Sequence, residues 1–197
     1  MLVKSINSFS SNNLKKIENL IWDFFIQGVK NKKSAFHYPT IGTSNGKNLN
    51  LRTVILRKVS KEMRLITFFT DFRSNKIKEL SINNEVKIHI YDKKNQIQIQ
   101  ADGLAEIIHK SDQSQMIWDS LPSYSKSIYL TKKPPGTIIK NEKIDLEKLD
   151  YLKAYENFSM VNIEIFKIYF LKLSREVNKK AMIKYEHKNI KYYWLIP

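Results

Sequence analysis

The chain has 197 residues, about the length of one domain, and 42% of them are hydrophobic, which is enough to bury a core. It has no cysteine, which excludes disulfides, thiolate catalysis and cysteine-bound zinc, and no apolar run approaches the roughly 18 residues of a membrane span. The first residues lack the apolar segment of a secretion signal, so we expect a cytoplasmic protein with one domain over 1–197 and no membrane partner.

The net charge of +15 has two interpretations. Basic residues gathered on one face would indicate a nucleic-acid partner, whereas dispersed lysines are typical of a solvated surface. The lysines run from Lys4 to Lys191, so we favour the surface interpretation and keep nucleic-acid binding as an alternative. Four of the five arginines fall within 52–73, where we expect planar, bidentate recognition of an anion.

The first half of the chain predicts a helix followed by short strands. A helical lead-in over 1–33 is capped by Asn12 or Asn13, has apolar residues at 3–4 spacing and stops at Gly28. Asn45-Gly46 predicts a tight hairpin turn, because this pair suits positive φ angles. The further elements expected here are strands over 36–43, 51–59 and 64–70, a helix over 74–82, and strands over 86–91 and 97–108.

The second half predicts helices and then a closing hairpin. One helix begins at Ser111-Asp112, and helical structure continues over 124–129. Pro134-Pro135-Gly136 ends this helical stretch. A charged helical insertion is expected over 138–157, with its helix over 145–156. Strands follow over 158–173, 181–185 and 190–196. The whole pattern predicts an α+β chain that forms one antiparallel barrel of six or seven strands with peripheral helices.

The stretch 52–76 carries the most informative chemistry. Arg52 and Arg57 have opposite parity on one predicted strand, so their side chains leave opposite faces unless the strand bulges. Arg73, Ser74 and Lys76 then stand at a helix start, where free N–H groups, a hydroxyl and cations suit a dianionic phosphate. An ordinary capped helix with surface cations explains the same residues, so both interpretations stay open.

Other polar residues give weaker signals. Gln96, Gln98 and Gln100 share one face of a strand, which suits either a solvated hairpin or an amide that hydrogen-bonds a heterocycle. The histidines lack the spacing of metal ligands, so no metal site is predicted. Motifs of Rossmann folds, P-loops and α/β-hydrolases do not occur.

Four motifs occur in an order that resembles a known family. They are Arg52-Thr-Val-Ile-Leu-Arg57, Phe68-Phe-Thr70-Asp, Arg73-Ser-Asn-Lys76 and Gln98-Ile-Gln-Ala-Asp-Gly103. Together they resemble the FMN-binding split-barrel family of pyridoxamine 5′-phosphate oxidase, over nearly the whole chain. The resemblance implies a split barrel, FMN as cofactor and a homodimer with FMN at the subunit interface. It also implies FMN contacts from Arg52, Val54, Leu56, Arg57, Phe69, Thr70, Arg73, Ser74, Asn75, Lys76 and Gln98.

A second block extends the resemblance to a substrate site. The segment from Tyr129 to Thr137 resembles the family pattern Tyr-x-x-x-Arg-Pro-x-x-Ser, which binds the phosphate of a pyridoxal-type substrate; read alone, it is a loop that ends a helix. The resemblance implies substrate contacts from Arg57, Tyr129, Lys133 and Thr137. Lys133 keeps the charge of the family's arginine but loses its bidentate fork.

The chain also departs from the family pattern. Asn75 stands where the phosphate motif has arginine, and Arg73 is the expected substitute. The family's Arg-Leu-His-Asp-Arg is replaced by residues 178–182, and a tryptophan expected against the flavin falls at Phe166. These departures resemble the oxidase-related branch of the family more than the vitamin B6 enzyme.

We therefore predict an FMN-dependent oxidoreductase that takes a hydride from a small, phosphorylated or carboxylated substrate and passes electrons to O₂. The reaction that the resemblance suggests is oxidation of pyridoxamine or pyridoxine 5′-phosphate. No catalytic side chain is assigned, because the flavin supplies the reactive chemistry. The alternatives are an FMN-binding protein without turnover, a nicotinamide-dependent flavin reductase and, more remotely, a basic nucleic-acid-binding barrel.

Overall fold

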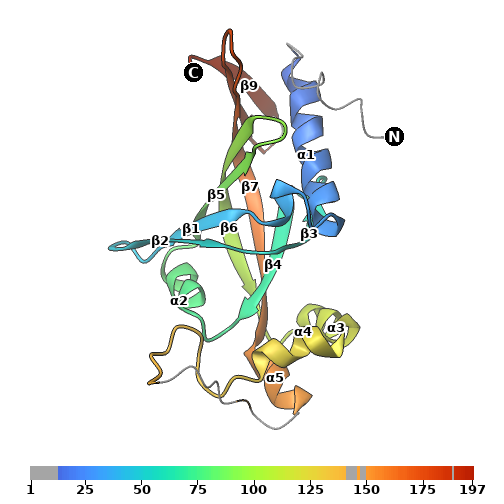
Figure 1. Cartoon of the computed structure of the whole chain (residues 1–197), viewed down its shortest axis with the longest axis vertical. Coiled ribbons are helices and arrows are strands. Elements are labelled where there is room, and N and C mark those ends of the chain that lie inside the picture. The colour runs from blue at the N-terminus through green and yellow to red at the C-terminus, as the bar shows by residue number, and fades with distance from the viewer. Residues whose placement is uncertain (1–12, 141–145, 147–149, 188) are drawn as a thin grey trace.

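The computed structural model describes residues 13–140, 146, 150–187 and 189–197 (Figure 1). A long twisted sheet runs along the molecule, with α1 beside one end and α3, α4 and α5 gathered at the other. The strands are β1 (Thr40–Ser44), β2 (Leu49–Thr53), β3 (Leu56–Ser60), β4 (Leu65–Asp71), β5 (Glu85–Asp92), β6 (Ile97–Ile108), β7 (Phe158–Lys172), β8 (Lys179–Tyr185) and β9 (Ile190–Leu195). The helices are α1 (Leu14–Lys30), η2 (Ala35–His37), α2 (Asn75–Ile82), α3 (Asp112–Ser120), α4 (Ser123–Lys126), η3 (Ser127–Tyr129) and α5 (Tyr151–Asn157).

The strands form one antiparallel sheet that curls into a split barrel. Its path is β2-β1-β5-β6-β7-β4-β3, and β8 and β9 continue from β7. The two ends of this path, β2 and β3, are separated in the chain only by residues 54 and 55. Such a link spans at most about 11 Å, so the sheet has to bend until its ends meet. Among the described strands, none pairs β2 with β3, which leaves the barrel split there.

Most predicted elements are confirmed, with three corrections. The sheet has nine strands rather than six or seven, partly because the strand predicted over 51–59 is two strands, β2 and β3. The strand predicted over 36–43 begins at Thr40, because Ser34 caps a 3-10 turn at residues 35–37. The helix predicted over 145–156 is described only as α5; residues 145 and 147–149 lie outside the described part, as do residues 1–12 of the lead-in.

Buried apolar side chains form two clusters on opposite faces of the sheet. The inner face, which carries Ile41, Ile88 and Ala101, packs against α1 and α2 in the larger cluster. At the end of β4 and β7, the outer face is covered by a smaller cluster that includes Trp118, from α3, and Tyr129. Successive residues on a strand point to opposite faces, so the face of each strand residue follows from its position.

A buried hydrogen-bond network fastens α1 to the last hairpin. Trp22 Nε1 donates to the Tyr185 hydroxyl at 2.8 Å, and that hydroxyl donates to Glu18 Oε1 at 3.0 Å. Tyr192 donates to the other oxygen of Glu18 at 2.6 Å. Every polar group in this apolar contact thus has a partner, which avoids the cost of burying an unpaired one.

Candidate functional site

The turn from β4 to α2 gathers the hydroxyl and ammonium groups that the sequence singled out. Lys76 Nζ donates to Thr70 Oγ1 at 2.9 Å and to Ser74 Oγ at 3.2 Å. Ser74 occupies the N-cap position of α2, but its side chain makes no capping hydrogen bond. The hydroxyl expected to cap the helix instead faces Lys76, and the positive end of α2 stays open to an anion.

Arg52 reaches this turn from β2. It pairs across the sheet with Ile41, so its side chain lies on the inner face, against α2. Its guanidinium donates to Thr43 Oγ1 and, at 2.9 Å, to Glu79 Oε2. Two of its five N–H groups are thereby used, and the described residues offer the other three no hydrogen-bond partner. We call Arg52, Thr70, Ser74 and Lys76 the α2 cluster.

The α2 cluster is electrostatically prepared for an anion. Burial lowers the pKa of Lys76 below the ordinary lysine value of 10.5, and the nearby charge of Arg52 lowers it further. Both effects disfavour the charged ammonium in the free protein. A phosphate beside Lys76 and Arg52 would relieve this repulsion, so the cluster fits the group that the sequence predicted.

Arg73 has a different role in the same turn. Its guanidinium forms a bidentate pair with Asp71, at 3.0 and 2.7 Å, and donates to Thr131 and to the carbonyl of Lys132. These bonds use all five of its N–H groups. In this arrangement Arg73 has no donor left for a phosphate, and it holds the segment that begins at Thr131 against the start of α2.

Arg57, predicted for both sites, lies at a bulge. The register of β3 against β4 shifts between Leu56 and Lys58, so Arg57 is the extra residue of a β-bulge. The sequence allowed for such a bulge when it placed Arg52 and Arg57 at opposite parity. Its guanidinium lies 5.7 Å from the centre of the Phe69 ring. The exposed Arg57 thus sits on the outer side of β4, whereas Thr70 belongs to the inner side.

The remaining predicted substrate residues lie near this turn but differ in exposure. Lys133 and Thr137 are exposed on the loop that Arg73 anchors, and a Cβ on Gly136 of that loop would lie 3.6 Å from Asn75 Nδ2. Tyr129 is buried, with its ring against Trp118 and Phe158. Burial raises the pKa of its hydroxyl, which keeps that group protonated.

The structure does not bring Gln98 to the α2 cluster. Arg52 shares a cross-strand row with Ile88 and Ala101 on the inner face. Gln98 is three residues from Ala101 on β6, so its side chain points to the outer face. Of the other predicted FMN contacts, Leu56 has its side chain in the core, and Val54 packs against that core while donating its N–H to Pro39.

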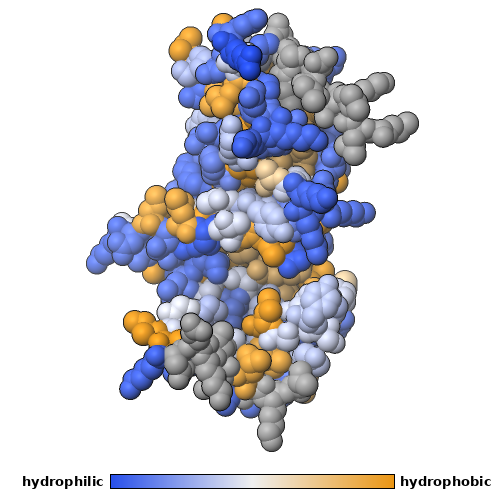
Figure 2. All heavy atoms as spheres, viewed as in Figure 1, coloured by the Kyte–Doolittle hydropathy of each residue, from blue (hydrophilic) through white to orange (hydrophobic). Residues whose placement is uncertain are grey.

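Gln98 lies instead on the outer face of the sheet. A groove of about 320 Å³ opens there, lined in part by Leu51, His89, Gln100 and Tyr169. Figure 2 shows apolar surface on the projecting β1–β2 hairpin, where Leu49 and Leu51 are 67% and 68% exposed. Exposed apolar patches of this kind mark interaction surfaces.

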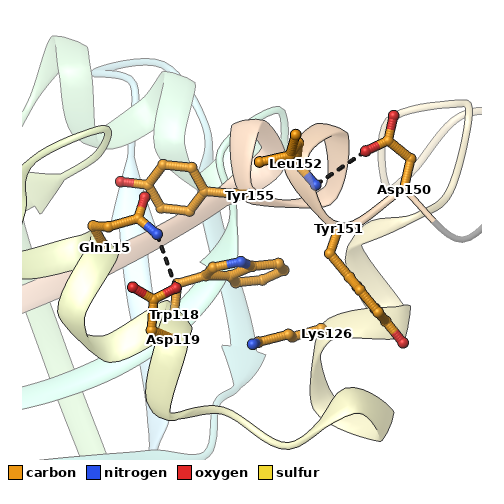
Figure 3. A pocket seen from close by; sticks show the side chains of 8 residues that line it. All are labelled: Gln115, Trp118, Asp119, Lys126, Asp150, Tyr151, Leu152 and Tyr155. Atoms are coloured by element: carbon orange, nitrogen blue, oxygen red, sulfur yellow. Dashed lines mark hydrogen bonds between the residues drawn. The ribbon is translucent and has the colours of Figure 1, made fainter.

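Another hollow, of about 360 Å³, lies among α3, α4 and α5 (Figure 3). Lys126 extends over the Trp118 ring there, 5.4 Å from its centre, beside Asp119 and Tyr151. None of the predicted site residues lines this hollow. Within the described residues, no cluster of acidic or histidine side chains is arranged to hold a metal ion, and no helix has the length and apolarity to span a membrane.

Sequence reasoning missed Glu79, the carboxylate that holds Arg52. It also missed Thr43 and Asn50, whose side chains donate to the same carboxylate. The spacing of Glu79 from Lys76, three residues along one helix, was a signal that the two lie on neighbouring turns. The partners on β1 and β2 carried no local signal, because only the folded hairpin places them beside α2.

Comparisons with known proteins bear on the family and the fold. A family model described as pyridoxamine 5′-phosphate oxidase, FMN-binding domain, matches residues 20–109. That range includes the α2 cluster and Gln98 but ends before Tyr129. A search of the curated proteins finds no match to the chain.

Solved structures show the same fold at low sequence identity. A pyridoxamine 5′-phosphate oxidase-related, FMN-binding protein from Nostoc punctiforme has a TM-score of 0.73 and 17% identity, covering 91% of this chain and 96% of its own. PhzG from Burkholderia lata, in complex with tetrahydrophenazine-1-carboxylic acid, has a TM-score of 0.67 and 13% identity, covering 100% and 98%. The chain is therefore similar, over residues 20–109, to the pyridoxamine 5′-phosphate oxidase FMN-binding domain family, and it has the split-barrel fold of these solved structures.

Proposed function

We propose that this protein is an FMN-dependent oxidoreductase whose α2 cluster binds the phosphate of FMN. The observation that carries the proposal is the pairing of two cations at a helix start that lacks a side-chain cap. Arg52 has three N–H groups without a partner among the described residues, and the pKa of Lys76 is lowered. Two neighbouring cations beside a helix N-terminus form a site for a dianion. When bound, FMN accepts a hydride from a substrate and returns two electrons to O₂.

The residues of the chain supply binding and orientation. Thr70 and Ser74 hold the Lys76 ammonium in place, so that little side-chain freedom is lost when a phosphate arrives. Phe69 and the Arg57 guanidinium lie on the outer side of β4, as Gln98 does on β6, so this apolar and cationic surface faces away from Arg52 and Thr70.

A second copy of the chain completes the site in this proposal. Gln98 faces away from Arg52 in one chain, so the two can meet on one flavin only if Gln98 comes from a partner. The exposed Leu49 and Leu51 beside the outer groove are the surface that such a partner would cover. A two-fold homodimer then has two equal sites at its interface.

The substrate we propose is small and anionic. Arg57, Lys133 and Thr137 present charge and hydroxyl groups near the start of α2. Tyr129 is buried, and its carbonyl accepts from Asn157 Nδ2 at 2.9 Å. Residues 178–182 lack the arginine and histidine of the family's vitamin B6 oxidases, so a phosphorylated or carboxylated compound other than pyridoxine 5′-phosphate also suits the site.

The purified protein's visible spectrum and its anaerobic reduction test this function. We expect a flavin spectrum that bleaches on addition of a phosphorylated amine such as pyridoxamine 5′-phosphate and returns on admission of O₂. Bleaching by reduced nicotinamide alone would favour the reductase alternative. A protein that takes up no flavin at micromolar concentration would overturn the proposal.

A further inference from the structure

A buried carboxylate stands inside a site that we assign to an anion. Glu79, on α2, is 7% exposed and lies three residues after Lys76. It accepts hydrogen bonds from Thr43 Oγ1, from Asn50 Nδ2 at 2.8 Å and from Arg52 at 2.9 Å. Burial disfavours its charge, but the hydrogen bonds from Thr43 and Arg52 outweigh that cost and hold the pKa of Glu79 below its ordinary value.

Glu79 is a counter-charge to Arg52 and Lys76, and its charge raises the pKa of Lys76, but this role alone does not favour an anion at the site. A carboxylate beside a phosphate repels it, so Glu79 weakens the site unless it contributes something else. Its three donors come from β1 and β2, and Thr43 contacts both Glu79 and Arg52. Arg52 is thus held by two adjacent acceptors, a carboxylate and a hydroxyl, while its other three N–H groups have no partner among the described residues.

We propose that Glu79 is a positioning residue that locks the Arg52 guanidinium beside Lys76, in the orientation that receives the phosphate of FMN. Thr43, whose hydroxyl contacts both Arg52 and Glu79, completes the lock. The gain is preorganisation, because a free arginine side chain loses many rotamers when it binds, whereas a fixed one loses few. This inference rests on the function proposed above.

Two variants distinguish a Glu79 that positions Arg52 from a Glu79 that only supplies a negative charge. Glu79→Gln keeps the shape of the side chain but removes the charge and one acceptor. Thr43→Val also keeps the shape and releases Arg52 without any change of charge. Glu164→Gln is the matched control, since Glu164 forms an ion pair with Arg64 at the same 2.9 Å, on an exposed part of β7.

The measurement is the dissociation constant for FMN and for riboflavin, which lacks the phosphate. We expect Glu79→Gln and Thr43→Val each to weaken FMN binding about tenfold, with riboflavin binding unchanged and Glu164→Gln without effect. In an Arg52→Lys background the loss caused by Glu79→Gln should vanish, because the group that Glu79 positions is gone.

The results that would overturn the role of Glu79 differ from those that would overturn FMN binding. Tighter or equal FMN binding by Glu79→Gln would show that the carboxylate is only a counter-charge, and would overturn the inference while the proposed function stands. An equal loss for FMN and riboflavin would indicate general structural damage and would also overturn it. A wild-type protein that binds no FMN would overturn both.

Discussion

At the scale of single residues, the number of unused N–H groups separates Arg52 from Arg73. Both lie near the start of α2, and both were predicted to contact FMN. Arg73 donates to Asp71, Thr131 and Lys132 with its whole guanidinium, whereas three N–H groups of Arg52 find no partner in the part of the chain that the structure describes. We infer that Arg52 binds the anion and Arg73 holds the neighbouring loop.

Lysine substitution should therefore affect the two arginines differently. Arg52→Lys should weaken FMN binding about tenfold or more, because one ammonium cannot replace a positioned fork. Arg73→Lys should leave FMN affinity within about threefold but release the loop, so that trypsin cuts faster after Lys132. A flavin titration and a timed digestion measure these effects. Equal losses of FMN affinity in both variants would show that Arg73 is also a ligand.

Lys76 gives the site a dependence on pH. Its pKa in the free protein lies below 10.5, so the ammonium is lost as the pH rises through that lowered value. A bound phosphate favours the ammonium, so binding takes up a proton in this range and FMN affinity falls as the pH rises. Titrations between about pH 7 and 10 should show this fall for wild type, and a flat profile for Lys76→Arg, whose guanidinium does not titrate there. An identical slope in both proteins would contradict the assignment.

The sequence could identify the arginines and the Ser74–Lys76 turn as candidates for anion binding, but it could not show which of them binds the anion and which holds a loop. In a lysine-rich chain the arginines of 52–73 stood out, and the Ser74–Lys76 turn indicated an anion. The partners that decide each task, Glu79 for Arg52 and Thr131 for Arg73, come from elements that only the fold brings together.

At the scale of elements, α1 is tied to the last hairpin by the hydroxyls of Tyr185 and Tyr192, and that of Tyr185 joins two residues of α1. The Tyr185 hydroxyl both accepts from Trp22 and donates to Glu18. Burial raises the pKa of Tyr185, so the hydroxyl stays protonated and can do both.

Removing that hydroxyl should loosen the contact. Tyr185→Phe leaves the Trp22 N–H and one oxygen of Glu18 without their partner, which costs about 1–3 kcal/mol of unfolding free energy. Chemical denaturation of wild type and variant measures the loss. Tyr193→Phe, on the exposed part of the same hairpin, is the control and should change stability little. A loss no larger than the control's would show that the network contributes nothing to stability.

Periodicity predicted α1, α2 and the long β7, because apolar spacing is local and these elements bury one side. It merged β2 and β3 into one strand, since residues 51–59 have β propensity throughout. The break at residues 54 and 55 comes from barrel closure, which sends β2 and β3 to opposite ends of the sheet path. That constraint is global and leaves no mark on the local pattern.

At the scale of the whole molecule, the predicted FMN contacts divide between the two faces of the sheet. The motif order predicted a split barrel, and the fold confirms it. The order could not show that Arg52 and Gln98 face opposite ways, because that depends on the pairing register of β1, β5 and β6.

If each FMN site combines Arg52 of one chain with Gln98 of its partner, two defective variants should complement each other in a mixed dimer. Arg52→Ala and Gln98→Ala should each bind FMN weakly as homodimers. Mixed after unfolding and refolding together, they should regain about a quarter of the wild-type sites, because half of the random dimers are mixed and each has one intact site. Fluorescence titration of FMN counts the sites. No recovery on mixing would show that Gln98 does not complement Arg52 across an interface.

The most direct test of the central claim, that the α2 cluster binds the phosphate of FMN, is the ratio of the dissociation constants of riboflavin and FMN for the flavin-free protein at neutral pH. With two charge-assisted contacts to the phosphate, the account predicts FMN binding about 100-fold tighter than riboflavin binding. It also predicts a ratio near one when Arg52 and Lys76 are both replaced by methionine. Equal affinity of the wild-type protein for the two flavins would contradict the account.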